Sequence, residues 1–475
     1  MLRTDARLKP ASPPPAGNRF STARQPYMAR RNYHHEIRSA FTFPIAAALA
    51  EGTFASVIAA KYFGAGVLLL AVISAAPMFG NILALFWAEL AERRPKVRFV
   101  NLLQLGVVAT VAAVGLTYFL PTLGGEPVWW GGWVFAGLIV VARVLASGIV
   151  TLRSTIWRYN YPRQSRAQIV SRITVVYNLI LGSMTFAGAM LLDAFPASYA
   201  LMYPLLAAVS LIGVHNYSKI RVRGEGARLR QQRLGDGDAT ADGPRLDYER
   251  PSALASFGTR LRTSFAVLGE DETFRKYQWL QFALGASFML MFPSLIHMVS
   301  KEMTDPATQY ALAVLVLHLI PMLTGVVAIQ LWAPVFDRMP LLKFRSVHST
   351  LVVVTHATTL TAALTDQLWL VGVATFLIGT CMGGGQLAWQ LGQHAFAPAE
   401  RSGAYMGVHV MLTGLRGMLA PFLGVGVYHL LGQTLTVNGV SGGRFVFAGS
   451  VLLAALGLVG YVRMSRRVGR LPYEN

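Results

Sequence analysis

Long apolar runs separated by short polar segments dominate the chain. A helix needs about 20 predominantly apolar residues to cross the hydrocarbon core of a bilayer, and twelve segments are long enough. They are residues 39–62, 66–91, 98–121, 128–152, 168–193, 197–218, 277–300, 308–334, 345–364, 367–393, 402–430 and 442–463. The pattern therefore predicts an all-α integral membrane protein with twelve transmembrane helices.

The composition supports a bilayer as the main partner of the chain. Hydrophobic residues make up 54% of the sequence and charged residues 13%, whereas a soluble domain has about 25% charged residues. The net charge of +20 comes from bases that flank the apolar runs rather than forming one patch, so we expect no nucleic-acid partner. The single cysteine, Cys381, excludes an intrachain disulfide and a cysteine metal cluster, and we expect no cofactor.

Lysine and arginine are distributed unequally between alternate polar segments. If the N-terminus lies inside, 37 of the 42 bases fall on the inner side. Only Lys61, Lys301 and Arg444 fall on the outer side, and Arg143 and Arg416 lie within apolar runs. Because bases are retained in the cytoplasm, both termini are expected to be cytoplasmic. With no secretory signal peptide in the N-terminal sequence, we expect a multi-pass protein of a bacterial inner (plasma) membrane.

A short motif occurs twice, in the polar segments after the second and eighth apolar runs. Trp87 and Trp332 lie 245 residues apart, and the same offsets from each lead to an acid, an arginine, a proline and a phenylalanine. These residues are Glu92, Arg93, Pro95 and Phe99 in the first copy, and Asp337, Arg338, Pro340 and Phe344 in the second. The repeat predicts two related six-helix bundles, 39–218 and 277–463, with terminal tails 1–38 and 464–475. A cytoplasmic linker, 219–276, joins them, and the apolar spacing in 252–268 suggests a membrane-surface helix.

This arrangement resembles the major facilitator superfamily. The family's loop pattern is roughly Gly-x-Leu-Ala-Asp-Arg-x-Gly-Arg-Arg, and residues 87–96, Trp-Ala-Glu-Leu-Ala-Glu-Arg-Arg-Pro-Lys, match it loosely. Asp337-Arg338 keeps the Asp-Arg pair, whereas Trp and Pro replace the two glycines. The resemblance implies two pseudo-symmetric bundles that alternate in access. It also implies a conformational gate, at Trp87, Glu92, Arg93, Arg94, Trp332, Asp337 and Arg338. The alternative is that the loop bases only set topology. An acid at the same offset in both halves favours the gate.

Three charged residues fall inside apolar runs, where insertion of each costs at least about 2.5–3.5 kcal/mol. Glu51 is at the midpoint of the first run, Arg143 near the middle of the fourth and Arg416 at the centre of the eleventh. In the superfamily, spans 1, 4, 7 and 10 line the central cavity, so Glu51 and Arg143 are expected to face it together. Glu51 would then take up a proton, and Arg143 would hold its charge or bind an anion. A static ion pair between spans 1 and 4 is the alternative.

Further polar side chains in the apolar runs are candidates for the cavity and for proton transfer. Gln386, Gln390 and Gln393 share a helix face beside Trp389, and Ser147 shares a face with Arg143. We interpret these five polar and aromatic side chains as substrate-cavity residues, with hydrogen bonds between packed helices as the alternative. His318 and His409 are candidate proton-relay residues, again with interhelical hydrogen bonding as the alternative.

The sequence thus predicts a monomeric secondary transporter for a small organic solute, with proton coupling through Glu51 as the hypothesis. Cavity charges of Glu51, Arg143 and Arg416 favour an anionic or zwitterionic solute. An integral-membrane lipid-modifying enzyme is one alternative, but no nucleophile–base arrangement, metal-ligand cluster or phosphate loop is evident in the sequence, and we expect no enzyme. A non-transporting sensor is the other alternative. The family signatures of spans 4 and 5 are not matched, so no subfamily is assigned.

Overall fold

The computed structural model describes residues 25–473 except 84–85, 88–89, 92–93, 121, 124–125, 128, 228, 231–265, 397–401 and 438. The helices of the first half are α1 (Tyr27–Leu49), α2 (Gly52–Tyr62), α3 (Val67–Ile82), α5 (Lys96–Gly115), α6 (Trp129–Asn160), α7 (Arg163–Ala194) and α8 (Tyr199–Ser218). Short 3₁₀ segments follow α5 and α7, namely η2 (Leu116–Phe119) and η3 (Pro196–Ser198). Most of the predicted cytoplasmic linker, 219–276, and most of the predicted surface helix within it, 252–268, lie outside the described residues.

The second half contains α11 (Glu272–His297), α12 (Tyr310–Val314), α13 (Ile320–Arg338), α14 (Leu341–Thr365), α15 (Leu368–Leu391), α16 (Ser402–Thr434) and α17 (Val446–Val468). Two π-helical segments, η5 (Met298–Met303) and η6 (Leu315–Leu319), continue α11 and α12, and η7 (Gly392–Ala395) and η8 (Gly442–Phe445) are 3₁₀ segments. Two small antiparallel hairpins connect helices. They pair β1 (Thr122–Leu123) with β2 (Glu126–Pro127), and β3 (Thr436–Val437) with β4 (Val440–Ser441).

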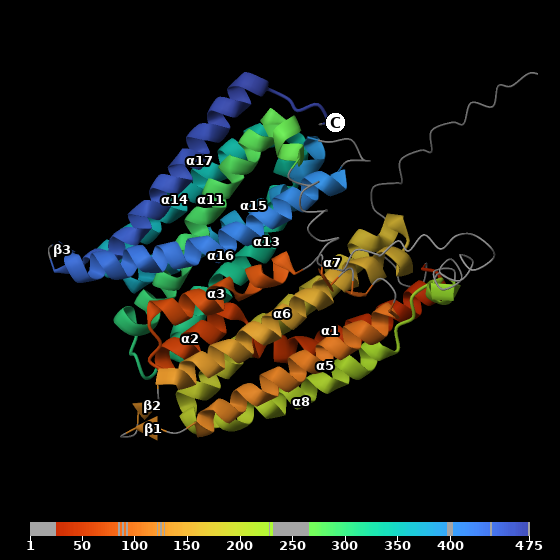
Figure 1. Cartoon of the computed structure of the whole chain (residues 1–475), viewed down its shortest axis with the longest axis horizontal. Helices are drawn as coiled ribbons and strands as arrows, with labels where there is room; N and C mark the ends of the chain where they lie inside the picture. Colours follow the sequence, from red (N-terminus) through yellow and green to blue (C-terminus); the bar gives the residue numbers. More distant parts are fainter. Residues whose placement is uncertain are drawn as a thin grey trace, which may run out of the picture.

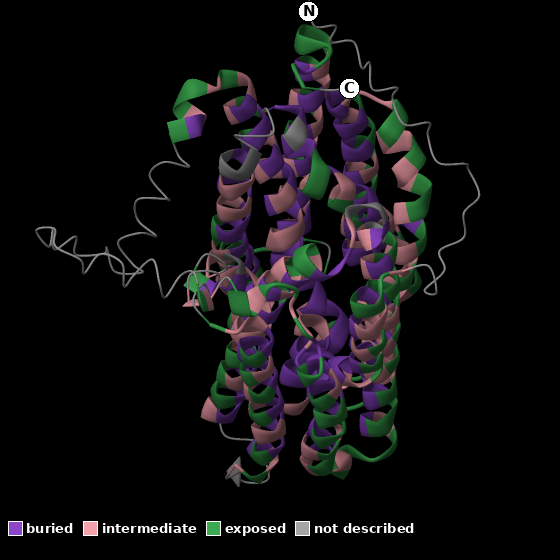
Figure 2. Ribbon diagram, turned by 90° about the vertical axis from the view of Figure 1, so that its right-hand side faces the viewer, coloured by how far each residue is buried: buried purple, intermediate pink, exposed green. Residues whose placement is uncertain are grey.

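The helices have the length and surface of membrane-spanning segments. Within the described residues, eleven helical segments are long and apolar enough to cross a bilayer. The remaining predicted span, which is the second in chain order (66–91), corresponds to the shorter apolar helix α3. Large apolar side chains such as Leu102, Leu205, Leu331 and Leu452 are exposed on the outer faces. Buried residues concentrate between the helices (Figure 2). Because apolar surface on this scale is stable in lipid and not in water, the chain is an integral multi-pass membrane protein.

The two halves repeat the same packing. The α1 and α11 helices begin 245 residues apart, as do α5 and α14, which is the offset of the Trp motif. A Cβ added to Gly148 would lie 2.9 Å from the Trp87 ring, and one added to Gly384 would lie 3.0 Å from the Trp332 ring. Each Trp therefore packs on a glycine of a neighbouring helix in its own half. This confirms the predicted fold class of two pseudo-symmetric bundles, which Figure 1 shows meeting along α3 and α16.

The first span differs from its prediction. Helix α1 starts at Tyr27, ahead of the predicted start at 39, and ends at Leu49. Glu51 was expected inside a continuous helix, but it is the N-cap of α2. Its Oε2 accepts hydrogen bonds from the N–H groups of Thr53 and Phe54 at 2.8 and 2.9 Å. A carboxylate at this position satisfies backbone donors that the helix start leaves unpaired. The local competition between side chain and backbone breaks the span at its charged residue.

Candidate functional site

A cavity of about 570 Å³ lies between the two halves. The first half contributes the start of α2, α3 and α6, through residues that include Glu51, Met78 and Arg143. The second half contributes α11, α14, α15 and α16, through residues that include Gln281, Arg345 and Arg416. A volume of this size is within the range of small-molecule binding sites. Phe288, Phe292 and Trp389 supply part of its apolar wall.

Positive charge predominates in the cavity wall. Among the lining residues, Glu51 is the sole carboxylate, whereas Arg143, Arg345 and Arg416 are all guanidinium groups. Glu51 and Arg143 do face the same cavity, but no ion pair joins them among the described residues. The partner of Glu51 is His318, whose Nδ1 lies 3.4 Å from Oε2.

His318 reaches Glu51 from the other half of the chain. It lies in η6, a π-helical turn between α12 and α13, and such turns are frequent at functional sites because they redirect side chains. The exposed fractions of the two side chains are 11% for His318 and 17% for Glu51. The Nε2 atom of His318 is buried with no hydrogen-bond partner among the described residues. The pair is thus a shielded contact between two titratable groups on opposite halves.

Arg416 lines the cavity and also bonds a neighbouring helix. Its Nη1 donates to the carbonyl of Gln281 on α11 at 2.7 Å. Gly285 makes this position possible, because a Cβ there would lie 2.0 Å from the Arg416 guanidinium carbon. Arg345 on α14 donates from Nη2 to the hydroxyl of Tyr461 at 3.2 Å, and that hydroxyl lies 3.2 Å from Oε1 of Gln281. We name these four side chains, Arg345, Arg416, Gln281 and Tyr461, the arginine cluster.

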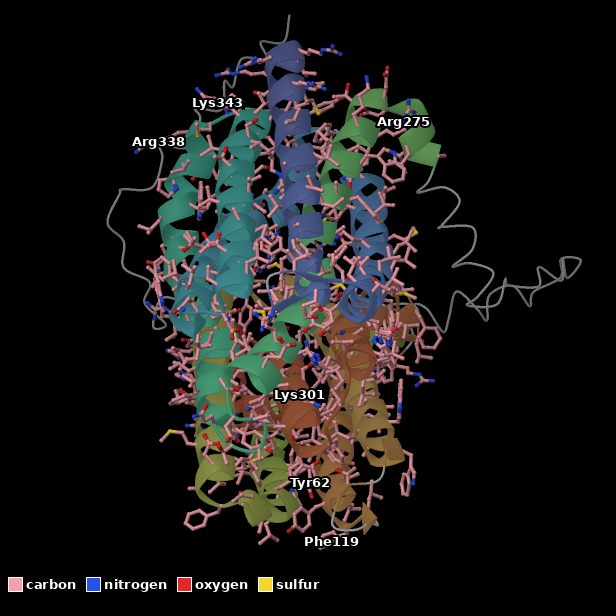
Figure 3. All side chains as sticks on the ribbon, turned by 90° about the vertical axis from the view of Figure 1, so that its left-hand side faces the viewer. Tyr62, Phe119, Arg275, Lys301, Arg338 and Lys343 are labelled. Atoms are coloured by element: carbon pink, nitrogen blue, oxygen red, sulfur yellow. The ribbon has the colours of Figure 1, made fainter. Side chains whose placement is uncertain are left out.

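Polar contacts hold the two halves together at one end. We call this the closed end. It is opposite the end at which α1 begins and α17 ends, which we call the terminal end. Lys61 of α2 donates from Nζ to the carbonyls of Ser300, Asp305 and Thr308 and to the hydroxyl of Thr304, at 2.5–3.0 Å. Nearby, Lys301 donates to the carbonyl of Gly64 at 2.7 Å. Figure 3 shows Tyr62 far from Arg338 and Lys343 of the terminal end.

A second bond set strengthens the closed end. The carboxylate of Asp193 on α7 accepts from the backbone N–H groups of Tyr310 and Ala311 at 2.6 and 2.8 Å, at the start of α12. In the adjoining loop, backbone N–H groups of Ala307 and Thr308 hold the pKa of the Asp305 carboxyl below its usual value. That carboxylate therefore stays ionised at neutral pH and keeps the loop in the conformation that meets Lys61.

The gate predicted from the repeated motif is only partly described. Glu92 and Arg93 lie outside the described residues. Asp337 and Arg338 are exposed and have no ion-pair partner in the described part of the chain, and exposed Arg94 lies 5.3 Å above the ring of Phe99. The two tryptophans are anchored, because Trp87 Nε1 donates to Ser147 at 3.1 Å and Trp332 Nε1 donates to the carbonyl of Thr380 at 3.0 Å.

The predicted cavity residues are only partly brought together. Gln386 and Trp389 line the cavity. Gln390 lies within α15 but is not among the lining residues. Gln393 lies beyond the end of α15, in η7, and its buried amide has no hydrogen-bond partner among the described residues. Ser147 supports Trp87 and is not among the lining residues. His409 is fully buried, and its Nδ1 lies 3.1 Å from the amide oxygen of Gln278, which is the interhelical alternative.

Sequence reasoning missed several buried charges. Arg345 was expected among the loop bases, but Pro340 precedes a helix that starts at Leu341, and Arg345 is 1% exposed inside it. A proline directly before an apolar run is a helix-start signal that could have placed it. Glu36 was expected in the tail, yet it is buried in α1. It accepts from Tyr161 at 2.6 Å and lies 3.4 Å from Arg153.

No protein-family model matches the sequence, and a search of curated proteins found no match. Solved structures do match. A variant of the nucleoside transporter NupG superposes with a TM-score of 0.64 at 11% identity, covering 91% of this chain and 99% of that one. A D-xylose-proton symporter gives 0.61 at 13% identity over 94% and 99%. A POT family transporter in complex with a thioalcohol-conjugated peptide gives 0.61 at 14% over 92% and 97%. The chain therefore has the fold that these transporters share, which is the fold of the major facilitator superfamily.

Proposed function

We propose that the protein is a secondary transporter that moves a small organic solute by alternating access, coupled to protons through Glu51 and His318. The observation that carries this proposal is the contact between these two titratable side chains, which joins the two halves beside a central cavity. Protonation of either group changes the attraction between them, so proton binding and the relative position of the halves are linked.

The two ends of the molecule support alternating access. Lys61, Lys301 and Asp193 join the halves at the closed end, whereas Asp337 and Arg338 are exposed at the terminal end. The uneven distribution of bases supports a cytoplasmic terminal end, and we infer that this conformation faces inward. We place the protein in a bacterial inner membrane, with both termini cytoplasmic. One chain supplies both walls of the cavity, so a monomer suffices.

The structural neighbours add support. They are a nucleoside transporter, a D-xylose-proton symporter and a peptide-bound POT family transporter. All are transporters and none is an enzyme, which favours transport over lipid modification. We also propose a gate at the terminal end. There, Glu92 and Asp337 would pair with bases of neighbouring helices when that end closes.

The test begins with the purified full-length protein. A library of metabolites is screened for thermal stabilisation at pH 6 and pH 8, because a ligand that binds the folded state raises its stability. Hits are then measured for uptake into proteoliposomes with and without an inward pH gradient. We expect gradient-driven accumulation in the wild type, and only downhill exchange in Glu51→Gln. Arg463→Gln, an exposed residue of α17, serves as control. Full gradient-driven uptake in Glu51→Gln would refute the coupling role.

A further inference from the structure

The arginine cluster holds two buried cations without a neutralising carboxylate. Arg345 and Arg416 are 1% and 5% exposed. The described residues offer no acidic side chain within ion-pair distance of either guanidinium. The Nε atoms of both arginines are buried and have no hydrogen-bond partner there. Removing a charge from water costs several kcal/mol unless a counter-charge compensates, so an anion bound beside these two guanidinium groups would offset that cost.

The first half of the chain shows how such a cation is normally neutralised. There, buried Arg153 lies 3.4 Å from the carboxylate of Glu36 on α1. The 245-residue offset that relates α1 to α11 takes Glu36 to Gln281. Gln281 bonds Tyr461 and Arg416 but brings no charge. The two halves therefore differ at equivalent positions, and in the second half, which lacks the acid, the buried arginines Arg345 and Arg416 line the cavity.

The remaining donors suit an oxyanion. Within the described part of the chain, each guanidinium makes one hydrogen bond through a terminal nitrogen, Arg345 to Tyr461 and Arg416 to Gln281. The other donors of each planar fork are left for a ligand in the cavity that both residues line. Guanidinium groups bind carboxylate and phosphate oxygens in pairs with this geometry. Both arginines are held by neighbouring side chains or glycine, so the site is organised before a ligand arrives.

The rest of the wall determines what the anion is attached to. Phe288, Phe292, Met289 and Trp389 line the same cavity and favour an apolar or aromatic body. We propose that the arginine cluster binds the carboxylate or phosphate group of an aromatic organic anion, with the ring against these apolar side chains. This rests on the proposed transport function for its physiological meaning, but binding itself does not require transport.

The experiment uses the purified full-length protein and matched probe pairs. Melting temperature is measured with benzoate against benzamide, and with phenyl phosphate against phenol, at constant ionic strength set by sodium chloride. We expect an acidic probe to raise the melting temperature and its neutral counterpart to bind at least about tenfold more weakly. The larger response of the two acids identifies the preferred acidic group. Equal responses within both pairs, or no response to any probe, would overturn the proposal.

Variants locate the effect. Arg416→Gln and Arg345→Gln are expected to abolish the difference between acid and neutral probe, whereas Arg463→Gln, which removes an exposed charge from α17, retains it. Gln281→Glu introduces the carboxylate that the first half has. It should therefore raise the melting temperature of the unliganded protein and remove the response of the melting temperature to benzoate. An unchanged benzoate response in Gln281→Glu and both arginine variants would refute the cluster as the site.

The outcome is separable from that of the transport proposal. An acid-selective response without uptake of any probe would support the anion site and count against transport. Gradient-driven, Glu51-dependent uptake of a neutral solute, with no discrimination between benzoate and benzamide, would support transport and refute the anion site.

Discussion

His318 Nδ1 lies 3.4 Å from Oε2 of Glu51, and this contact joins the two halves of the protein beside the cavity. Glu51 also caps α2, so any change in its charge acts on a helix start as well as on the contact between the halves. One elementary charge that crosses a potential of 100 mV is worth about 2.3 kcal/mol. A proton carried by this pair could therefore drive accumulation of a solute.

The pair is expected to make the separation of the halves depend on pH. Spin labels at Arg158→Cys on α6 and Lys343→Cys on α14, in a Cys381→Ser background, report the opening of the terminal end by their distance. We expect the distance distribution to differ between pH 5 and pH 8, because protonation of either side chain changes the attraction across their 3.4 Å contact. Glu51→Gln and His318→Gln should each suppress the shift. A shift that persists unchanged in both variants would contradict the coupling.

Lys61 is expected to stabilise the inward-facing state. Its ammonium group has three N–H donors and lies within hydrogen-bond distance of four oxygens of the other half. Hydrogen bonds to charged groups contribute about 1.5–3 kcal/mol each. In Lys61→Met we therefore expect the population to shift by about tenfold or more to the conformation in which the halves separate at the closed end and approach each other at the terminal end. The label pair at the terminal end should report this as a shorter distance. Lys301→Met removes a single exposed bond and should have a smaller effect. Equal effects of the two variants would argue against this latch.

Glu36 and Arg153 form a test of buried charge in the first half. Glu36→Gln leaves Arg153 without its counter-charge, and breaking a buried pair in this way costs about 3–5 kcal/mol. Thermal unfolding in detergent should show a large loss in Glu36→Gln. The double variant Glu36→Gln with Arg153→Met should recover part of it, since neither charge then remains buried alone. Additive losses in the double variant would show that the two side chains do not interact.

Two glycines of α15 are expected to respond oppositely to alanine. A Cβ at Gly379 would lie 1.9 Å from Oγ1 of Thr324 and 2.3 Å from the carbonyl of Pro321, whereas one at Gly372 meets nothing within 4 Å. Gly379→Ala should therefore lower the stability by about 1–3 kcal/mol through overpacking against α13. Gly372→Ala should be neutral or stabilising by up to about 1 kcal/mol, because alanine favours a helix. Comparable melting temperatures would contradict the close approach of these helices.

Eleven of the twelve predicted spans and the two related halves were predictable because both depend on local pattern. Apolar length alone decides whether a helix can cross a bilayer, and the repeated Trp motif carries the 245-residue offset that the starts of α1 and α11 also obey. The predicted course of a span was wrong where a polar side chain within it bonds the backbone and interrupts the helix. Glu51 interrupts the first span by bonding Thr53 and Phe54, an interaction that apolar periodicity does not register.

The site was predictable in kind but not in its pairings. The intramembrane charges Glu51, Arg143 and Arg416 stood out because each is costly in lipid, and all three line the cavity. The sequence placed Arg143 beside Glu51, whereas the structure places His318 there. Residues on different helices have no fixed relation along the chain, so their contacts depend on how the helices rotate and where they bend.

By itself, the sequence determined that this chain is a membrane protein of two related halves, because transfer of apolar segments into lipid depends on their composition and length. It also marked the charged residues that need a partner. Only the tertiary structure decided which partner each one has. Packing of α11, α14, α16 and α17 buries Arg345 and Arg416 around Gln281 and Tyr461, and the position of Gly285 gives Arg416 its space. Such assignments depend on the distances between helices, which no periodicity along the chain encodes.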